Sequence, residues 1–191
     1  MLRIIRSADY LTRPWKNGGG TTRDIAVSPP GASLDDFVWR LSLAQVDRDG
    51  PFSRFDNVDR TLVLFSGEMT LHEQDGRIDL IRHQPVVFAG ERAIAATVAG
   101  GATLDLNVMT RRGRARHVVR RESFGKQVIL AASAGKTIAL LALGNELTVD
   151  SEQLHAYDTA IVSASQVAVV ATIGVVDALV IEIDDIHPNV L

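Results

Sequence analysis

The sequence contains no cysteine, and lysine is rare. The first absence excludes disulfide bonds, thiolate metal ligands and cysteine nucleophiles together, and it is typical of a cytoplasmic protein. No apolar run reaches the roughly 20 residues that span a bilayer. Arg3, Arg6 and Asp9 also interrupt the start of the chain, where a signal peptide needs a continuous apolar stretch. We therefore expect a cytoplasmic protein that does not associate with a membrane.

The histidines lack the spacing that a metal centre uses. A metal needs several convergent nitrogen or oxygen ligands, and pairs spaced H-x-H or H-x-x-x-H supply them. No such pair occurs among the five histidines, His72, His83, His117, His155 and His187. The G-x-S-x-G turn of a serine hydrolase is absent as well. We expect no bound metal and no other cofactor.

Basic charge gathers in one segment, residues 111–121, which contains six arginines. Such a cluster can bind anions or nucleic acid, or it can be a solvated connector between two β-rich halves. No aromatic side chain is interleaved for base stacking, and the net charge of the whole chain is −3. Both observations favour the connector, and we expect no nucleic-acid partner.

Hydrophobic residues alternate with polar ones along much of the chain, which predicts an all-β fold. Asp75-Gly76 separates two such runs, and this dipeptide predicts a two-residue type I′ hairpin turn. Short helices are compatible with residues 33–37 and 151–155 only. The clearest strands are expected at residues 38–46, 61–65, 69–74, 77–81, 85–89, 102–110, 127–132, 137–143, 159–162, 167–173 and 179–183.

The segment from Pro14 to Ile25 reads P-W-K-N-G-G-G-T-T-R-D-I. Three consecutive glycines let the backbone approach a ligand or another strand, and their N–H groups can form an anion-binding concavity. Lys16 and Arg23 would add positive charge beside it. The alternative is a turn that leads into a strand, because the spacing of a phosphate-binding loop is missing.

Taken in order, several such motifs resemble the HutD/Ves family of bacterial proteins. The motifs are P-W-K-N-G-G-G-T-T-R-D-I, W-R-L-S-L-A (residues 39–44), D-G-P-F-S-R-F (49–55), D-R-T-L (59–62), F-A-G-E (88–91) and D-L-N-V-M-T-R-R (105–112). The resemblance implies a bicupin-like fold, in which two β-barrel halves of the jelly-roll or cupin type form one compact protein. We place these halves at residues 1–112 and 113–191. It also implies a connection with bacterial histidine utilisation.

Strand parity places polar side chains inside the first half. Arg40 and Ser42 lie on the strand face opposite Trp39, Leu41 and Leu43, and Asn107 shares a face with Asp105. Guanidinium groups in a cleft suit bidentate binding of a carboxylate. A structural network that ties the strands together is the alternative, and we favour it for Asp105. The residues expected to bind ligand are Lys16, Asn17, Arg40, Ser42, Arg60 and Asn107.

These observations favour a metal-free binding protein for a small organic acid, with a regulatory or accessory role. The family resemblance alone implies urocanate or formylglutamate as candidate ligands. An isomerase or hydrolase that uses Lys16 or Asp105 in acid–base chemistry is a second reading, since such barrels host enzymes and binders alike. An interaction module with an empty barrel is a third. Exposed barrel edges are compatible with a homodimer.

Overall fold

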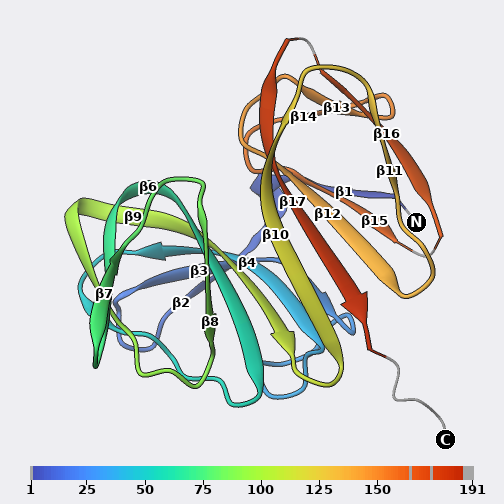
Figure 1. Cartoon of the computed structure of the whole chain (residues 1–191). Helices are drawn as coiled ribbons and strands as arrows, with labels where there is room; N and C mark the ends of the chain where they lie inside the picture. Colours follow the sequence, from blue (N-terminus) through green and yellow to red (C-terminus); the bar gives the residue numbers. More distant parts are fainter. Residues whose placement is uncertain (1, 164, 173, 187–191) are drawn as a thin grey trace, which may run out of the picture. The chain divides into compact units, whose positions relative to one another are not determined.

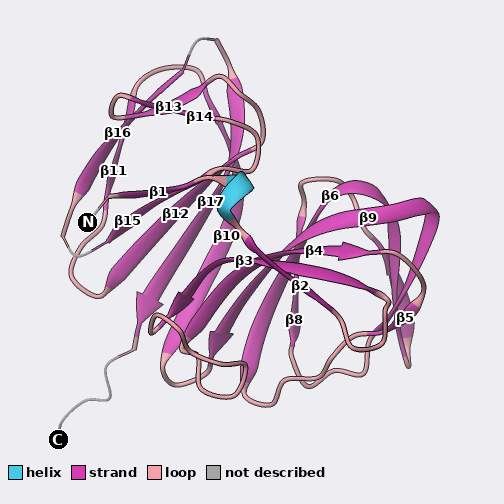
Figure 2. Cartoon of the chain, turned by 180° about the vertical axis from the view of Figure 1, so that it is seen from behind, coloured by secondary structure: helices cyan, strands magenta, loops and turns pink. Residues whose placement is uncertain are grey.

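The computed structural model describes residues 2–163, 165–172 and 174–186, and these residues are almost entirely β-structure (Figure 1). Their helical content is the short 3-10 turn η1 (Ser7–Asp9), drawn in cyan in Figure 2. The predicted all-β class is therefore confirmed. Neither expected helix forms: residues 33–37 make a turn, and the strand β14 (Glu152–Leu154) occupies most of 151–155. Within the described residues, no helix has the length and apolar character needed to cross a membrane.

The chain forms two compact units, which we call the first unit (Leu11–Arg112) and the second unit (Met1–Tyr10 with Gly113–Leu191). The first unit is one antiparallel sheet in the order β2-β3-β4-β9-β6-β7, with β5 added to β9 and β8 to β6. Its strands are β2 (Leu11–Pro14), β3 (Gly20–Ser28), β4 (Trp39–Val46), β5 (Gly50–Pro51), β6 (Val58–Glu73), β7 (Gly76–Asp79), β8 (Pro85–Ala89) and β9 (Ala95–Arg111).

Two long strands, β6 and β9, bend this sheet (Figure 1). The register of their pairing shifts on both sides of Ser66, and Gly67 has a φ of 79°. Extra residues of this kind kink a strand and increase its twist. The curved sheet surrounds an apolar cluster that includes Val46, Leu62 and Phe88. Within the described residues the strand order runs from β2 to β7 without closing, so a closed barrel is not found here.

The hairpin between β6 and β7 forms, but its turn is not the predicted one. Glu73 pairs with Gly76, so the two loop residues are Gln74 and Asp75, and neither they nor Gly76 has a positive φ. The register places Leu71 opposite Ile78, both of which pack in the apolar cluster. A turn at Asp75-Gly76 would place Leu71 opposite Leu80 instead, and Leu80 also packs against this cluster. The observed turn therefore changes the pairing by two residues and leaves the same strand faces toward the core.

The second unit is a sandwich of two antiparallel sheets. One has the order β1-β15-β12-β17-β10, and the other has the order β11-β16-β13-β14. Apolar side chains from both sheets, such as Leu140, Leu147 and Val170, are fully buried in a common core. The remaining bounds are β1 (Arg3–Ile5), β10 (Ala115–Phe124), β11 (Val128–Ala131), β12 (Lys136–Ala142), β13 (Leu147–Val149), β15 (Thr159–Ser163), β16 (Val167–Thr172) and β17 (Val176–Asp185).

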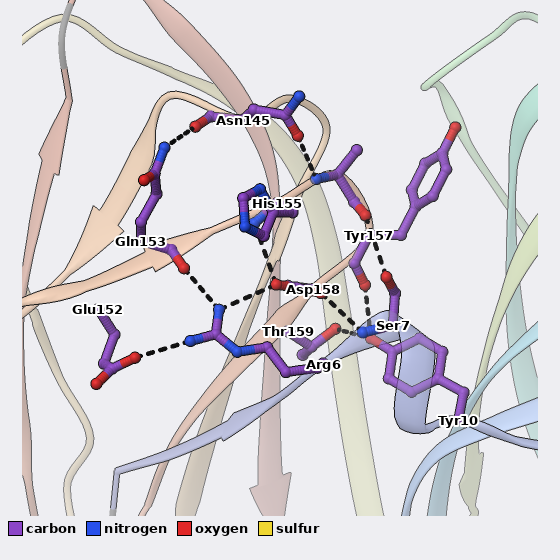
Figure 3. Close-up of polar contacts among 11 residues, drawn as sticks. Arg6, Ser7, Tyr10, Asn145, Glu152, Gln153, His155, Tyr157, Asp158 and Thr159 are labelled. Atoms are coloured by element: carbon purple, nitrogen blue, oxygen red, sulfur yellow. Dashed lines mark hydrogen bonds and ion pairs between the residues drawn. The ribbon is translucent and has the colours of Figure 1, made fainter.

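The first ten residues belong to the second unit, because β1 pairs with β15 and a polar network anchors the segment after it (Figure 3). Asp158 accepts hydrogen bonds from the Ser7 amide (2.7 Å) and from the Arg6 guanidinium (3.1 Å). Arg6 also contacts Glu152, and the Tyr10 hydroxyl donates to the Tyr157 carbonyl (2.6 Å). Burial alone would raise the pKa of Asp158, but these hydrogen bonds to the carboxylate lower it below its ordinary value.

The arginine-rich segment contains the junction of the two units, between Arg112 and Gly113, but most of it is a strand rather than the predicted solvated connector. Residues 115–124 form β10, which pairs along its whole length with β17. Its arginines face carboxylates: Arg116 pairs with Asp184, Arg120 with Glu182 and Arg121 with Asp177. Opposite charges on neighbouring strands stabilise the pair. The period-two pattern was hidden here because arginines occupy both faces of the strand, Arg116 and Arg120 on one face and Arg121 on the other.

Candidate functional site

A cavity of about 600 Å³ lies in the first unit. All six residues that the sequence nominated line it, so the structure brings them together; that they bind a ligand remains a prediction. The cavity walls come from the curved sheet and from the loops after β2 and β5. The lining residues are Arg13, Pro14, Trp15, Lys16, Asn17, Thr22, Leu34, Arg40, Ser42, Ala44, Val46, Pro51, Phe52, Ser53, Phe55, Arg60, Asp105, Asn107 and Met109.

Strand parity explains why these side chains meet. Arg40, Ser42, Ala44 and Val46 follow one another at every second position of β4, and all four line the cavity. The intervening Leu41 and Leu43 are fully buried on the opposite face. β9 is paired with β4 and contributes Asp105, Asn107 and Met109 by the same alternation.

Arg60, at the start of β6, is buried beside the cavity. Its Nη2 donates to Asn107 Oδ1 (2.5 Å) and its Nη1 to the Ser53 carbonyl (3.2 Å). Three phenylalanine rings, Phe52, Phe55 and Phe88, lie 5.0–5.5 Å from the guanidinium carbon. Cation–π contacts of this kind hold a partly desolvated guanidinium. Burial lowers the pKa of Arg60 to about 10, although the charge of Asp105 opposes this shift.

Arg40 has a partner within the protein that the sequence did not reveal. It forms an ion pair with Asp24 on β3, and Arg13 lies 3.4 Å from the same carboxylate. Neither Asp59 on β6 nor Asp105 on β9 fills this role. Asp59 instead pairs with Arg112 (2.7 Å), because it alternates with Arg60 along β6 and so lies on the other face. A bulge in β3 after Asp24 shifts the register against β4.

Asp105 is the acidic member of the lining, and it is 1% exposed. Its Oδ1 accepts a hydrogen bond from Asn107 Nδ2 (2.7 Å), whereas its Oδ2 has no hydrogen-bond partner. Burial raises the pKa of Asp105 to about 7, and the charge of Arg60 and the bond from Asn107 oppose this shift. Asp105, Asn107 and Arg60 therefore form a buried chain that links a carboxyl group to a guanidinium through one amide.

The glycine segment is a tight turn rather than the anion-binding concavity considered above. The Gly18 amide donates to the Trp15 carbonyl (3.0 Å), and the Gly19 amide donates to Asn17 Oδ1 (3.0 Å). These two N–H groups are thus occupied within the turn. The turn presents the exposed Lys16 at the edge of the cavity. Arg23 does not line the cavity, since it alternates with Thr22, which does.

The loop that carries Phe52 and Phe55 is fastened to the segment after β8. The Phe55 amide donates to the Gly90 carbonyl (2.9 Å), and a Cβ on Gly90 would lie 2.6 Å from the Phe55 carbonyl oxygen. Glu91 accepts hydrogen bonds from the Arg112 guanidinium (2.5 and 2.8 Å), which lower the pKa of this carboxyl to about 2. The F-A-G-E motif therefore supports a wall of the cavity.

Potential metal ligands are not clustered in the part of the chain that the structure describes. No group of three or more histidine, aspartate and glutamate side chains is placed there to hold a metal ion. His187 lies outside the described residues. His72 contacts Thr97 (3.0 Å), and the ring of His83 packs edge-on against Phe65.

Some residues of the site escaped the sequence reasoning, namely Asp24, Arg13 and the aromatic rings around Arg60. The signal for Phe52, Phe55 and Phe88 was present, because all three fall inside motifs that carried the family resemblance. Their role could not be assigned, since aromatic side chains in short motifs are equally typical of core packing. Asp24 also lies in such a motif, but its position beside Arg40 depends on the register between β3 and β4, which the sequence does not show.

Comparison with known proteins places the chain in a family. The family model described as HutD matches residues 7–179. The chain belongs to the HutD family. The "Uncharacterized 21.2 kDa protein in hutC 3'region" of Pseudomonas putida is 32% identical over 164 residues, which cover 82% of this chain and 84% of that protein. Protein Ves of Citrobacter koseri is 41% identical over 109 residues, 56% of each chain. The match thus spans little more than half the length of Ves.

Solved structures agree with this HutD assignment. HutD from Pseudomonas fluorescens SBW25 superposes with a TM-score of 0.82 at 26% identity, covering 97% of this chain and 99% of that one. The bacterial pirin YhhW of Escherichia coli, solved in complex with nickel(II), gives a TM-score of 0.70 at 7% identity, covering 98% and 100%. The second likeness shows the fold alone. The chain is therefore a cupin-like protein of the HutD family.

Proposed function

We propose that this HutD-family protein binds a small organic acid in the cavity of its first unit and serves a regulatory or accessory role. The charge of the lining carries this proposal. Four cationic side chains, Arg13, Lys16, Arg40 and Arg60, line the cavity. They exceed the two carboxyl groups nearby, Asp105 in the lining and Asp24, which pairs with Arg40 and Arg13. A concave, partly desolvated site with excess positive charge attracts anions, and guanidinium groups suit carboxylates in geometry.

The remaining lining suits the organic part of such a ligand. Trp15, Phe52, Phe55 and Met109 provide an apolar wall, and Ser42 and Asn107 add hydrogen-bonding groups. Ligand pockets of about 300–1,000 Å³ usually combine an apolar wall with a few polar groups that fix orientation. We infer that Lys16, Asn17, Arg40, Ser42, Arg60 and Asn107 contact the ligand, without a metal.

The relatives suggest which acids to test. One is named for its position beside hutC, and one structural relative is HutD itself. We therefore propose an intermediate of histidine breakdown, urocanate or formylglutamate, as the ligand of a cytoplasmic protein. We also infer that the two units correspond to the two halves of a bicupin, an arrangement supported by the likeness to YhhW.

Calorimetry with matched ligands and variants tests this function. We expect N-formylglutamate or urocanate to bind, and their uncharged methyl esters to bind at least tenfold more weakly. Arg40→Gln should lower the affinity by about tenfold or more, because a hydrogen bond to a charged group contributes about 1.5–3 kcal/mol. Its stability cost should be only about 1–3 kcal/mol, since the pair with Asp24 is partly exposed.

Arg77→Gln is the matched control, because Arg77 is exposed on β7 and does not line the cavity. Its affinity should equal that of the wild type. Equal binding of acids and esters, or full affinity in Arg40→Gln, would rule out a carboxylate held by this residue. Failure of every acid to bind would favour the interaction module.

One observation supports an enzyme as the second candidate. A carboxyl group whose pKa is raised to about 7 can exchange protons at neutral pH, as a general acid or base does. Asp105 would then act on the bound acid as part of an isomerase or hydrolase. Incubation of each acid with the protein, followed by NMR, distinguishes turnover from binding, and Asp105→Asn should abolish any turnover.

A further inference from the structure

Asp105 occupies an unusual electrostatic position in the cavity. Among the described residues it is the only acidic side chain that lines the cavity, and its cross-strand neighbours, Ala44 and Leu64, are apolar. One carboxyl oxygen is bonded to Asn107, and the other is buried without a partner. A buried carboxylate oxygen without a donor is costly, because it has given up water and gained nothing.

The nearest positive charge does not neutralise Asp105 directly. Arg60 reaches it only through Asn107, and within the described part of the chain no ion pair joins the two. The Nε of Arg60 is also buried without a partner. Together, Asp105, Asn107 and Arg60 are neutral when Asp105 is ionised and carry one positive charge when Asp105 is protonated. An anion entering the cavity is therefore favoured by the protonated form.

We propose that anion binding in this cavity is coupled to the uptake of one proton by Asp105, which makes Asp105 a positioning residue that sets the charge specificity of the site. The inference rests on the proposed function, because it requires an anion in this cavity. The proton comes from the solvent and remains on the carboxyl group. The bound anion then faces Arg60 without competition from a second negative charge.

The other charged groups around Asp105 reinforce this coupling. Arg60 comes from β6, Arg40 from β4, and Arg13 and Lys16 from β2 and the turn after it. Asp24 on β3 is paired with Arg40 and Arg13. No histidine lines the cavity in the described part of the chain. Since burial raises the pKa of Asp105 to about 7, its charge changes within the range of cellular pH.

Calorimetry with N-formylglutamate tests the inference. This probe has no imidazole, so its own charge stays constant between pH 6 and pH 8, unlike that of urocanate. With the wild type we expect uptake of about one proton per ligand at pH 8, measured from the binding heats in two buffers of different ionisation enthalpy. The affinity should fall about tenfold from pH 6 to pH 8, as one linked proton requires.

Asp105→Asn should bind with the same affinity at pH 6 and pH 8, without proton uptake, and about tenfold more tightly than the wild type at pH 8. Asp75→Asn is the matched control, because Asp75 is exposed in the turn between β6 and β7; it should behave like the wild type. The number of protons taken up on binding is measured with wild-type protein alone. It therefore tests the coupling even if Asp105→Asn does not fold. Binding without proton uptake overturns the coupling and leaves the proposed function standing. No binding of any acid in the panel overturns both.

Discussion

The hydrogen-bonded residues Asp105, Asn107 and Arg60 carry buried charge. This charge costs stability in the free protein, but it is available for binding a ligand. Two polar atoms of this group are buried without a partner, the Oδ2 of Asp105 and the Nε of Arg60. Buried polar groups in proteins are usually satisfied, and exceptions often coincide with function. A ligand that supplies the missing partners would resolve this conflict. The same groups should also leave a signature in the stability of the free protein.

We predict that the contribution of Asp105 to stability decreases as the pH rises. Its pKa in the folded protein, about 7, is higher than its ordinary value of 3.8. The folded state therefore binds this proton more tightly than the unfolded state, and the gain is lost as the pH rises through about 7. Relative to Asp105→Asn, the wild type should lose about 2–3 kcal/mol of unfolding free energy between pH 5 and pH 8. Urea denaturation of both proteins measures this difference, and a constant difference would contradict the raised pKa.

At the scale of single residues, the sequence predicted the direction in which side chains point better than it predicted their interaction partners. The alternation of Arg40 and Ser42 with buried leucines was enough to place both side chains in the cavity, and the same holds for Asn107. The partner of Arg40 could not be predicted, because Asp24 reaches it across a bulge between strands. Nor could the sequence show that Asn107 would separate Asp105 from Arg60, since side-chain geometry decides that.

Among the elements, the turn before β3 depends most on a single residue type. β3 and β4 approach so closely at Gly20 that a Cβ there would lie 2.1 Å from the Gln45 carbonyl oxygen. The Trp15 amide also donates to the Gly20 carbonyl (2.9 Å). The glycine run therefore serves close packing of backbones, and this packing positions Lys16 and Asn17 beside the cavity.

We predict that Gly20→Ala destabilises the protein by about 3 kcal/mol, because the new methyl group meets backbone that cannot move aside. Gly76→Ala is the matched control, since no atom lies within 4 Å of its added Cβ and its φ is not positive. It should change the unfolding free energy by less than about 0.5 kcal/mol. Chemical denaturation measures both effects. Equal stability of the two variants would refute the close approach at Gly20.

Strands in which polar and apolar residues alternate clearly could be predicted from the sequence. Strands that form through pairing with neighbouring strands could not. Residues 85–89 were placed at the bounds of β8, and residues 38–46 fell within one residue of β4. β10 was missed because arginines lie on both of its faces and mask its period. β13 and β14 have three residues each, which is too short for a recognisable pattern. Such strands form because neighbouring strands complete their hydrogen bonds.

Across the whole molecule, the division of the chain depends on contacts that are distant in sequence. The sequence suggested halves at residues 1–112 and 113–191, whereas the contacts group residues 1–10 with the second. Three residues of β1 pair with β15, more than 150 positions away. No local pattern reveals such a pairing. The two units also differ inside, because buried apolar side chains fill the core of the second, whereas the first contains a cavity lined by charged as well as apolar side chains.

This difference leads to a prediction for hydrogen exchange. A bound acid stabilises the segments that must open to release it, and at 100 times its Kd the gain is about 2.7 kcal/mol, or about 100-fold slower exchange. Mass spectrometry with saturating N-formylglutamate should show this slowing only in peptides that carry lining residues, within 13–22, 34–46, 51–60 and 105–109. Peptides from β12, β15 and β17 should exchange as in the free protein, because their side chains do not line the cavity. Arg40→Gln at the same ligand concentration provides the control, since its weaker binding should reduce the protection in the first unit. Slowing of equal size in the core strands of the second unit would contradict a site confined to residues 11–112.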